Sequence, residues 1–120
     1  MPPLALAVVD AVFGLALHHD ERGRRAKRPG FTRAHVRARL EGPRASDPIG
    51  ALEFEVRVTH EPDPSGEGEV EEQRVGFTVD LLEQRILAAE LSLAELPLDR
   101  SGLARLIGEL ETWCYDRVQV

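Results

Sequence analysis

The sequence predicts an α+β fold, in which an antiparallel sheet of three to five strands carries one or two helices packed on one face. Two observations support this fold class. Residues 31–40 and 49–60 alternate apolar with polar side chains, the pattern of strands that have one buried face. Residues 101–118 carry apolar side chains at the spacing of an amphipathic helix, which we expect to lie across the sheet.

The two alternating segments are predicted to be neighbours in the sheet, because their polar faces carry opposite charges. These faces hold, in the first segment, Arg33, His35, Arg37 and Arg39 and, in the second, Glu53, Glu55 and Arg57. Opposite charges on adjacent antiparallel strands attract, so we expect the strand arginines to pair with Glu53 and Glu55. The connection between the segments contains two prolines, a serine and an aspartate, as turns do.

Residues 4–17 are apolar on nearly every side, so periodicity alone does not distinguish a strand from a helix. Val8, Val12 and Leu15 fit a helical period. The strand is favoured because a longer series, which includes β-branched and aromatic side chains, fits a strand period: Ala5, Ala7, Val9, Ala11, Phe13, Leu15 and Leu17. In either case we expect the segment to belong to the core.

A third strand is predicted at residues 74–81, where alternate side chains are again apolar. The segment before it, residues 61–73, is rich in proline, glycine and glutamate and is therefore predicted to be a loop.

Residues 80–96 fit two structures. A helix is favoured, because Asp80 could cap it, with Glu83 three residues later, and because alanine, leucine and glutamate are good helix formers. The alternative is a strand that turns near Glu83 and Gln84 and pairs back on residues 75–81.

The last element, residues 101–118, is the predicted amphipathic helix, with Ser101 as its N-cap. Cys114 lies on its apolar side, where we expect the thiol to pack rather than to react. The apolar stripe consists of Leu103, Leu106, Ile107, Leu110, Cys114 and Val118.

The length of 120 residues suits a single domain, residues 1–120, with its own core. The one cysteine excludes an internal disulfide and a multi-cysteine zinc site. The N-terminus has no basic leader and no small-residue cleavage site, and its apolar run is too short to span a bilayer. We therefore expect a cytoplasmic protein that makes no membrane contact.

Charge is segregated along the chain, although the net charge is only −6. Residues 20–44 hold nine basic and three acidic side chains, whereas residues 45–120 hold six basic and seventeen acidic ones. Segregated charge favours recognition of a charged partner. The chain has no nucleophile beside a base, no metal-ligand spacing among its histidines and no phosphate-binding glycine loop, so no catalytic, metal or cofactor residue is predicted.

These features predict a non-catalytic protein-binding or assembly module that acts through a basic surface (22–44) and an acidic surface (45–120). The expected partner is another protein or a second copy of the chain. Trp113 lies at the edge of the helix stripe, where it would either close the core or anchor a partner. The residues predicted to contact the partner are Arg22, Arg24, Arg25, Lys27, Arg28 and Trp113.

Two other function classes remain open. The cluster at residues 22–28 could bind nucleic acid, although Phe31 is the only nearby aromatic residue that could stack on bases. The chain could instead be a small enzyme or ligand-binding domain with polar residues such as His35, His60 and Asp80 on its sheet. Steeply salt-dependent binding would indicate the first class, and bound zinc the second.

One stretch resembles a known enzyme family. Phe31-Thr32-Arg33-Ala34-His35 is similar to the F-x-x-A-H strand of the 6-pyruvoyl-tetrahydropterin synthases, and residues 76–81 resemble the segment before that family's first helix. The resemblance would make His35 the counterpart of one zinc ligand. The family's H-G-H motif would fall at residues 48–51, where this chain has P-I-G-A, and the family's closing pair of strands is missing. The resemblance thus implies a related scaffold without the metal.

Overall fold

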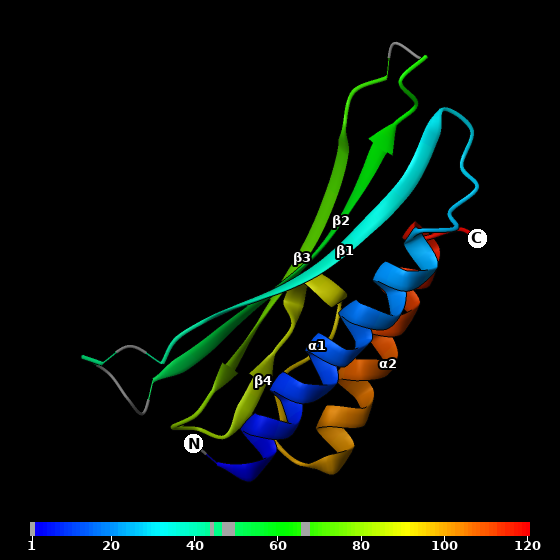
Figure 1. Ribbon diagram of the computed structural model, residues 1–120. Helices are drawn as coiled ribbons and strands as arrows, with labels where there is room; N and C mark the ends of the chain where they lie inside the picture. Colours follow the sequence, from blue (N-terminus) through cyan, green and yellow to red (C-terminus); the bar gives the residue numbers. More distant parts are fainter. Residues whose placement is uncertain (1, 44, 47–49, 66–67) are drawn as a thin grey trace.

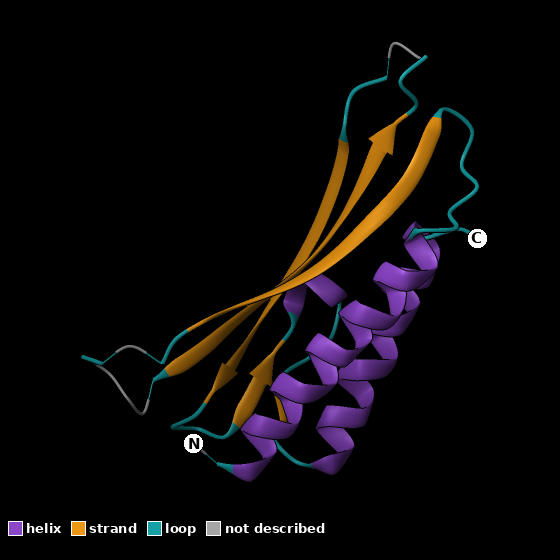
Figure 2. Cartoon of the chain, in the orientation of Figure 1, coloured by secondary structure: helices purple, strands orange, loops and turns teal. Residues whose placement is uncertain are grey.

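The computed structural model describes residues 2–43, 45–46, 50–65 and 68–120. Five antiparallel strands form one sheet in chain order, and two helices cover one of its faces (Figures 1 and 2). The predicted α+β fold is therefore confirmed. In chain order the elements are α1 (Pro3–Gly23), β1 (Phe31–Glu41), β2 (Ala51–Pro62), β3 (Glu71–Asp80), β4 (Arg85–Leu87), the 3-10 helix η1 (Ala89–Leu91), β5 (Leu96–Pro97) and α2 (Arg100–Arg117).

The two alternating segments are neighbouring antiparallel strands, as predicted. Val36 of β1 lies opposite Val58 of β2, and both side chains are buried beneath the helices. On the other side of β2, Phe54 lies opposite Phe77 of β3, and their rings stack with centroids 4.8 Å apart and planes within 5°. The period-two pattern therefore marked the buried face correctly in all three long strands.

The prediction of a strand at residues 4–17 was wrong, because the segment is the first part of the 21-residue helix α1. Pro3 starts the helix at a position where its missing N–H costs nothing. The run is apolar at almost every position, so it matched the strand template without being a strand. The side chains that are actually buried follow the helical period: Ala5, Val8, Val12, Leu15, Ala16 and His19.

The favoured helix at residues 80–96 was also wrong, and the strand alternative is correct for β4. The carboxylate of Asp80 accepts the N–H groups of Leu82 and Glu83, as an N-cap would, but the chain then turns through Gln84 at φ 51°. Asp80 also binds Arg85, the first residue of β4, at 3.1 Å. Asp80 therefore does bind the N–H groups that follow it, but these bonds stabilise the turn of a hairpin between β3 and β4 and not the start of a helix.

Helix α2 begins one residue earlier than predicted, and Asp99 rather than Ser101 caps it. The Asp99 carboxylate accepts the N–H of Gly102 at 2.8 Å. A Cβ atom on Gly102 would lie 1.9 Å from the carbonyl oxygen of Pro97, so the start of α2 depends on a glycine at this close approach to β5.

The two helices lie side by side and run in the same direction (Figure 1). His19 of α1 contacts Glu111 of α2 at 2.6 Å, and Arg22, one turn later, contacts the carbonyl of Val118 just beyond the end of α2. The hydrophobic core lies between this helical layer and the inner face of the sheet. Leu106, Leu110 and Cys114 of α2 are fully buried in it.

Candidate functional site

The predicted basic cluster divides into two groups in the structure. Arg22 turns inward: it lies 4.0 Å above the ring of Tyr115 and donates to the carbonyl of Val118 at 3.0 Å. Arg28 pairs with Glu71 at 2.6 Å and lies over the ring of Phe31. These two arginines join the helices and strands to one another.

The remaining members, Arg24, Arg25 and Lys27, form what we call the basic triplet. All three are exposed in the connection that follows α1, and no carboxylate in the described part of the chain lies within ion-pair distance of them. They follow the C-terminal end of a helix, where the helix dipole favours positive charge. The triplet is therefore a cationic surface that the fold tolerates and does not neutralise.

Trp113, the other predicted contact residue, is half-buried and packs against the core. The guanidinium of Arg117 lies 4.3 Å above its ring and donates to the backbone carbonyl of Trp113 at 3.0 Å. The indole is thus partly covered by a side chain of its own helix.

On the outer face of the sheet, arginines and glutamates lie next to one another. Arg37, Arg57 and Arg74 lie directly opposite one another on β1, β2 and β3. Such a row of like charges is unfavourable by itself. Glu55 and Glu72 offset it, because each binds Arg57 at 3.0 Å and lies within 4.0 Å of Arg74.

The strand arginines of β1 do not make the predicted pairs with Glu53 and Glu55. Arg37 pairs with Asp20 of α1 at 2.7 Å. The other two pair with glutamates in the same region of the sheet, Arg33 with Glu61 and Arg39 with Glu41. For Arg37 the reason is the register, which places Arg57 rather than a glutamate opposite it. Arg39 does lie opposite Glu55, but Glu55 binds Arg57 and Arg74 instead.

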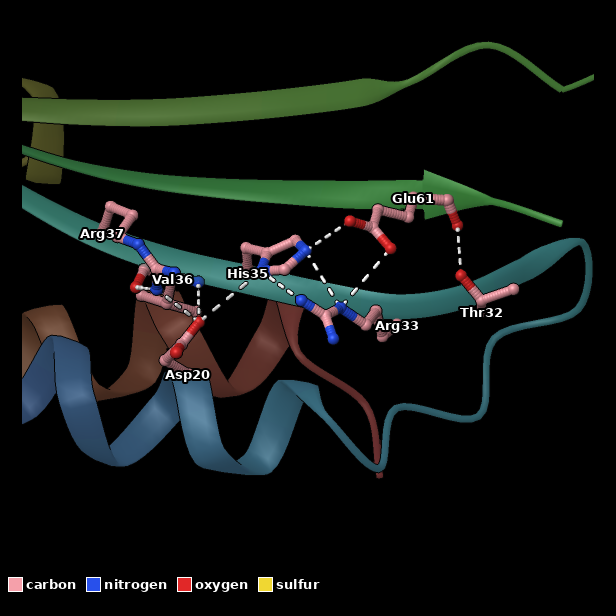
Figure 3. A network of polar contacts seen from close by, with 7 residues as sticks. All are labelled: Asp20, Thr32, Arg33, His35, Val36, Arg37 and Glu61. Carbon is pink, nitrogen blue, oxygen red and sulfur yellow. Dashed lines mark hydrogen bonds and ion pairs between the residues drawn. The ribbon is translucent and has the colours of Figure 1, made fainter. Parts of the chain in front are cut away.

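Asp20 anchors α1 to the open edge of the sheet (Figure 3). Its Oδ1 accepts the backbone N–H of Val36 at 2.9 Å and the guanidinium of Arg37. Burial alone would raise the pKa of Asp20, but the bonds from Val36 and Arg37 outweigh it and hold the pKa below its usual value. This carboxylate is therefore ionised, and its Oδ1 is bound by both groups.

His35 lies beside this anchor, between two carboxylates (Figure 3). Its Nε2 is 2.5 Å from Oε1 of Glu61, and its Nδ1 is 4.0 Å from Oδ1 of Asp20. The hydrogen bond with His35 lowers the pKa of Glu61. Each acidic group in the cluster already has a protein partner, so the cluster serves to hold α1, β1 and β2 together.

The two buried histidines are neutral donors. Arg22 donates to Nδ1 of His19, and since a guanidinium only donates, the ring proton lies on Nε2 and is shared with Glu111. His60 donates from Nε2 to the carbonyl of Arg117 at 2.9 Å. Burial is the largest influence on both residues and lowers the pKa of each.

Within the described ranges, no group of three or more His, Cys, Asp or Glu side chains is placed to hold a metal ion. Cys114 is fully buried, and burial raises the pKa of its thiol to about 12. A thiol in this state is a poor nucleophile.

The sequence analysis missed an exposed apolar row on α1, because it assigned residues 4–17 to the core as a whole. The row consists of Leu6, Phe13 and Leu17, whose side chains are 50%, 37% and 68% exposed. Their spacing, with Asp10 between them, places all four residues on one side of the helix. We call these three apolar residues the α1 row.

Helix α1 also has the length and the apolar composition of a membrane-spanning helix. The predicted 17-residue run was too short to span a bilayer, but the helix itself has 21 residues. Core helices meet the same criteria, and Val8 and Val12 of α1 are fully buried against the rest of the chain.

Comparisons with protein-family models, with curated proteins and with solved structures gave no match. The resemblance to the pterin synthases thus remains confined to a few residues. After Leu81 the chain forms a turn and β4 instead of the helix that the resemblance implied. Residues 48–49, part of the position of the second family motif, lie outside the described residues.

Proposed function

We propose that this protein is a non-catalytic module that binds an amphipathic helix of a partner protein. The binding surface is the α1 row together with the basic triplet. The observation that carries the proposal is the α1 row, because three large apolar side chains are exposed in line on one helix. The other large aliphatic side chains of α1 are buried or packed against the core, namely Leu4, Val8, Val9, Val12 and Leu15.

The geometry of the row suits a helical partner. From Leu6 to Leu17 the row covers about 16 Å of helix axis, or three turns. A partner helix presents apolar anchors at intervals of three and four residues, and these anchors match the spacing of the row. Burying what is exposed of the three side chains would contribute about 3 kcal/mol of hydrophobic free energy.

Charge defines the rest of the partner. The basic triplet lies at the C-terminal end of the row and is complementary to acidic residues on the partner helix. Asp10 lies within the row and would require a lysine or arginine opposite it. The partner helix is therefore apolar along one side, acidic at one end and basic at one position in its middle.

Two other classes of partner are less well supported. A lipid bilayer would have to accept the charged Asp10 in the middle of the inserted face, and an anionic bilayer would repel a protein with a net charge of −6. For nucleic acid, the 22–28 cluster offers only the three cations of the basic triplet, because Arg22 and Arg28 make internal contacts.

A pair of model peptides tests the proposal. Both are labelled 18-residue helices with leucines at heptad spacing, and the remaining positions are mainly glutamate in one and lysine in the other. Fluorescence anisotropy should show at least tenfold tighter binding of the acidic peptide. Leu17→Ser should weaken that binding at least tenfold, and Arg25→Glu should weaken it severalfold.

Matched control substitutions distinguish binding at this surface from non-specific hydrophobic or electrostatic binding. Leu82 is 66% exposed in the turn before β4, and Leu82→Ser should leave binding unchanged. Arg100 is exposed at the start of α2, and Arg100→Glu should do the same. Equal losses in Leu17→Ser and Leu82→Ser would overturn the proposal. Dimerisation that Leu17→Ser abolishes would also overturn it, because the row would then bind a second copy.

A further inference from the structure

A polar cavity of about 450 Å³ lies where the end of α2 meets β2, β3 and the connection after α1. Gln119, one residue before the C-terminal end marked in Figure 1, is one of its lining residues. Its volume is within the range of small-molecule sites. The side chains that line it come from four parts of the chain: Arg28, His60, Gln73, Asp116, Arg117 and Gln119.

Two side chains of this wall already donate to carbonyls at the C-terminal end of α2, which is the negative end of the helix dipole. His60 donates to the carbonyl of Arg117, and Arg117 donates to the carbonyl of Trp113. Because Nε2 of His60 carries the proton, its Nδ1 is left as a hydrogen-bond acceptor. Two carbonyls at this end of α2 are therefore already bound by side chains of the cavity wall.

Arg117 is the unusual member of the wall. Its Nε is buried and has no hydrogen-bond partner, the one such side-chain atom among the described residues. Among the described residues, its guanidinium forms no ion pair with a carboxylate within 4.0 Å, whereas Arg105 of the same helix pairs with Glu109. Native proteins rarely leave a buried donor unpaired without a reason. One carbonyl and the face of Trp113 hold this guanidinium, which is a weak attachment for a charged group.

Arg28 brings a second guanidinium to the cavity. It uses Nη1 to bind Glu71 and rests over Phe31, which leaves most of its five N–H groups for another acceptor. Gln73 and Gln119 add amide donors. Asp116 is the one carboxylate among the described lining residues, and it would accept from an amino or hydroxyl group of a ligand.

We infer that this cavity binds a small organic anion through a carboxylate or phosphate group. Arg117 anchors the anion: its guanidinium leaves the indole face, turns into the cavity and thereby pairs the Nε that is otherwise unsatisfied. Arg28 provides the second contact. Arginine suits this role because its planar fork matches both carboxylate and phosphate. The site is separate from the α1 row, and neither proposal depends on the other.

The fluorescence of Trp113 should detect the movement of the Arg117 guanidinium, because Trp113 is the only tryptophan in the chain and Arg117 stacks on it. Its fluorescence should change and saturate on titration with inorganic phosphate or with acetate, in each case at constant ionic strength. Saturation by phosphate alone assigns the site to phosphate-bearing ligands, and saturation by acetate assigns it to carboxylates. A change that does not saturate, and that sodium chloride reproduces, would overturn the inference.

Variants and calorimetry complete the test. Arg117→Gln should weaken the calorimetric affinity for the saturating anion at least tenfold, and Arg28→Gln should weaken it severalfold. Arg105→Gln is the matched control, because Arg105 lies on the exposed side of α2, where it pairs with Glu109. Equal loss in Arg105→Gln and Arg117→Gln would overturn the inference. If Arg117→Gln does not fold, Arg117→Lys and Arg28→Gln decide, and full affinity in both would overturn it.

Discussion

Oδ1 of Asp20 lies 2.9 Å from the backbone nitrogen of Val36 and accepts its N–H, so a side chain of α1 binds an outward-facing donor of the edge strand β1. β1 has a neighbour on one side only. Edge strands leave N–H groups unpaired, and proteins commonly cover or charge such edges. Here one carboxylate of α1 binds one N–H of this edge, at Val36, and ties the first helix to the strand.

Asp20→Ala should therefore destabilise the protein by about 1–3 kcal/mol, because a buried backbone donor would lose its acceptor. Asp20→Asn keeps an oxygen acceptor and should cost less, about 1 kcal/mol, since the ion pair with the exposed Arg37 contributes little. Urea unfolding of both variants checks the order. Equal losses in the two would show that charge, not the bond to Val36, provides the stability.

The Asp20 contribution should depend on pH. The pKa of Asp20 is lower in the folded protein than in the unfolded chain, so the carboxylate stabilises the fold above the unfolded pKa, which is about 3.9. The contribution is lost as the pH falls through the folded pKa. The difference in unfolding free energy between wild type and Asp20→Asn should therefore shrink below pH 4, and a constant difference would contradict this assignment.

His19 should make the protein less stable between pH 7 and pH 5. Burial lowers its pKa in the folded state, so the unfolded chain binds a proton more readily. Stability from this residue is complete above about pH 6.5 and declines as the pH falls toward the folded pKa. Urea midpoints at both pH values measure the decline, and His19→Gln should make it smaller.

Cys114 should be almost inert toward thiol reagents in the native protein. It is fully buried, and its pKa of about 12 leaves very little thiolate at pH 8. Reaction with an aromatic disulfide reagent should be at least about 100-fold slower in buffer than in urea, where the pKa returns to its ordinary value. Comparable rates in both solvents would mean that α2 opens readily.

Two glycines of α2 should respond in opposite directions to alanine. In Gly102→Ala the new Cβ would overlap the Pro97 carbonyl, which as backbone cannot easily move, so the fold should lose stability. Gly108 faces open space, and Gly108→Ala should stabilise by about 0.5–1 kcal/mol through helix propensity alone. Thermal melts of the two variants give the comparison, in which a shift of the same sign would contradict the packing of α2 on β5.

The long strands could be predicted from the sequence because one rule governs them: alternation marks a face that is half buried. Residues 4–17 could not be assigned in the same way, since a nearly uniform apolar run satisfies both periods. Residues 80–96 failed for another reason. Asp80 bonds to the N–H groups two and three residues later, and this local geometry is common to a helix start and to a turn.

The candidate surfaces were predictable only in part. The free cations Arg24 and Arg25 were found from charge alone. The occupation of Arg22 and Arg28 was not, because their partners Val118 and Glu71 are 96 and 43 residues away in the chain. The α1 row was missed because the segment is apolar on nearly every side. Which side of the helix is exposed is known only once the side that packs on the sheet is known.

Helices α1 and α2 cover the inner side of the sheet together (Figure 2), and Leu93 and Leu98, outside both helices, are also buried in this core. If both helices detached from the sheet, the buried valines of β1, β2 and β3 would become exposed to water together. Partial opening therefore has a high free energy, and the molecule should unfold as one cooperative unit instead of fraying from an edge.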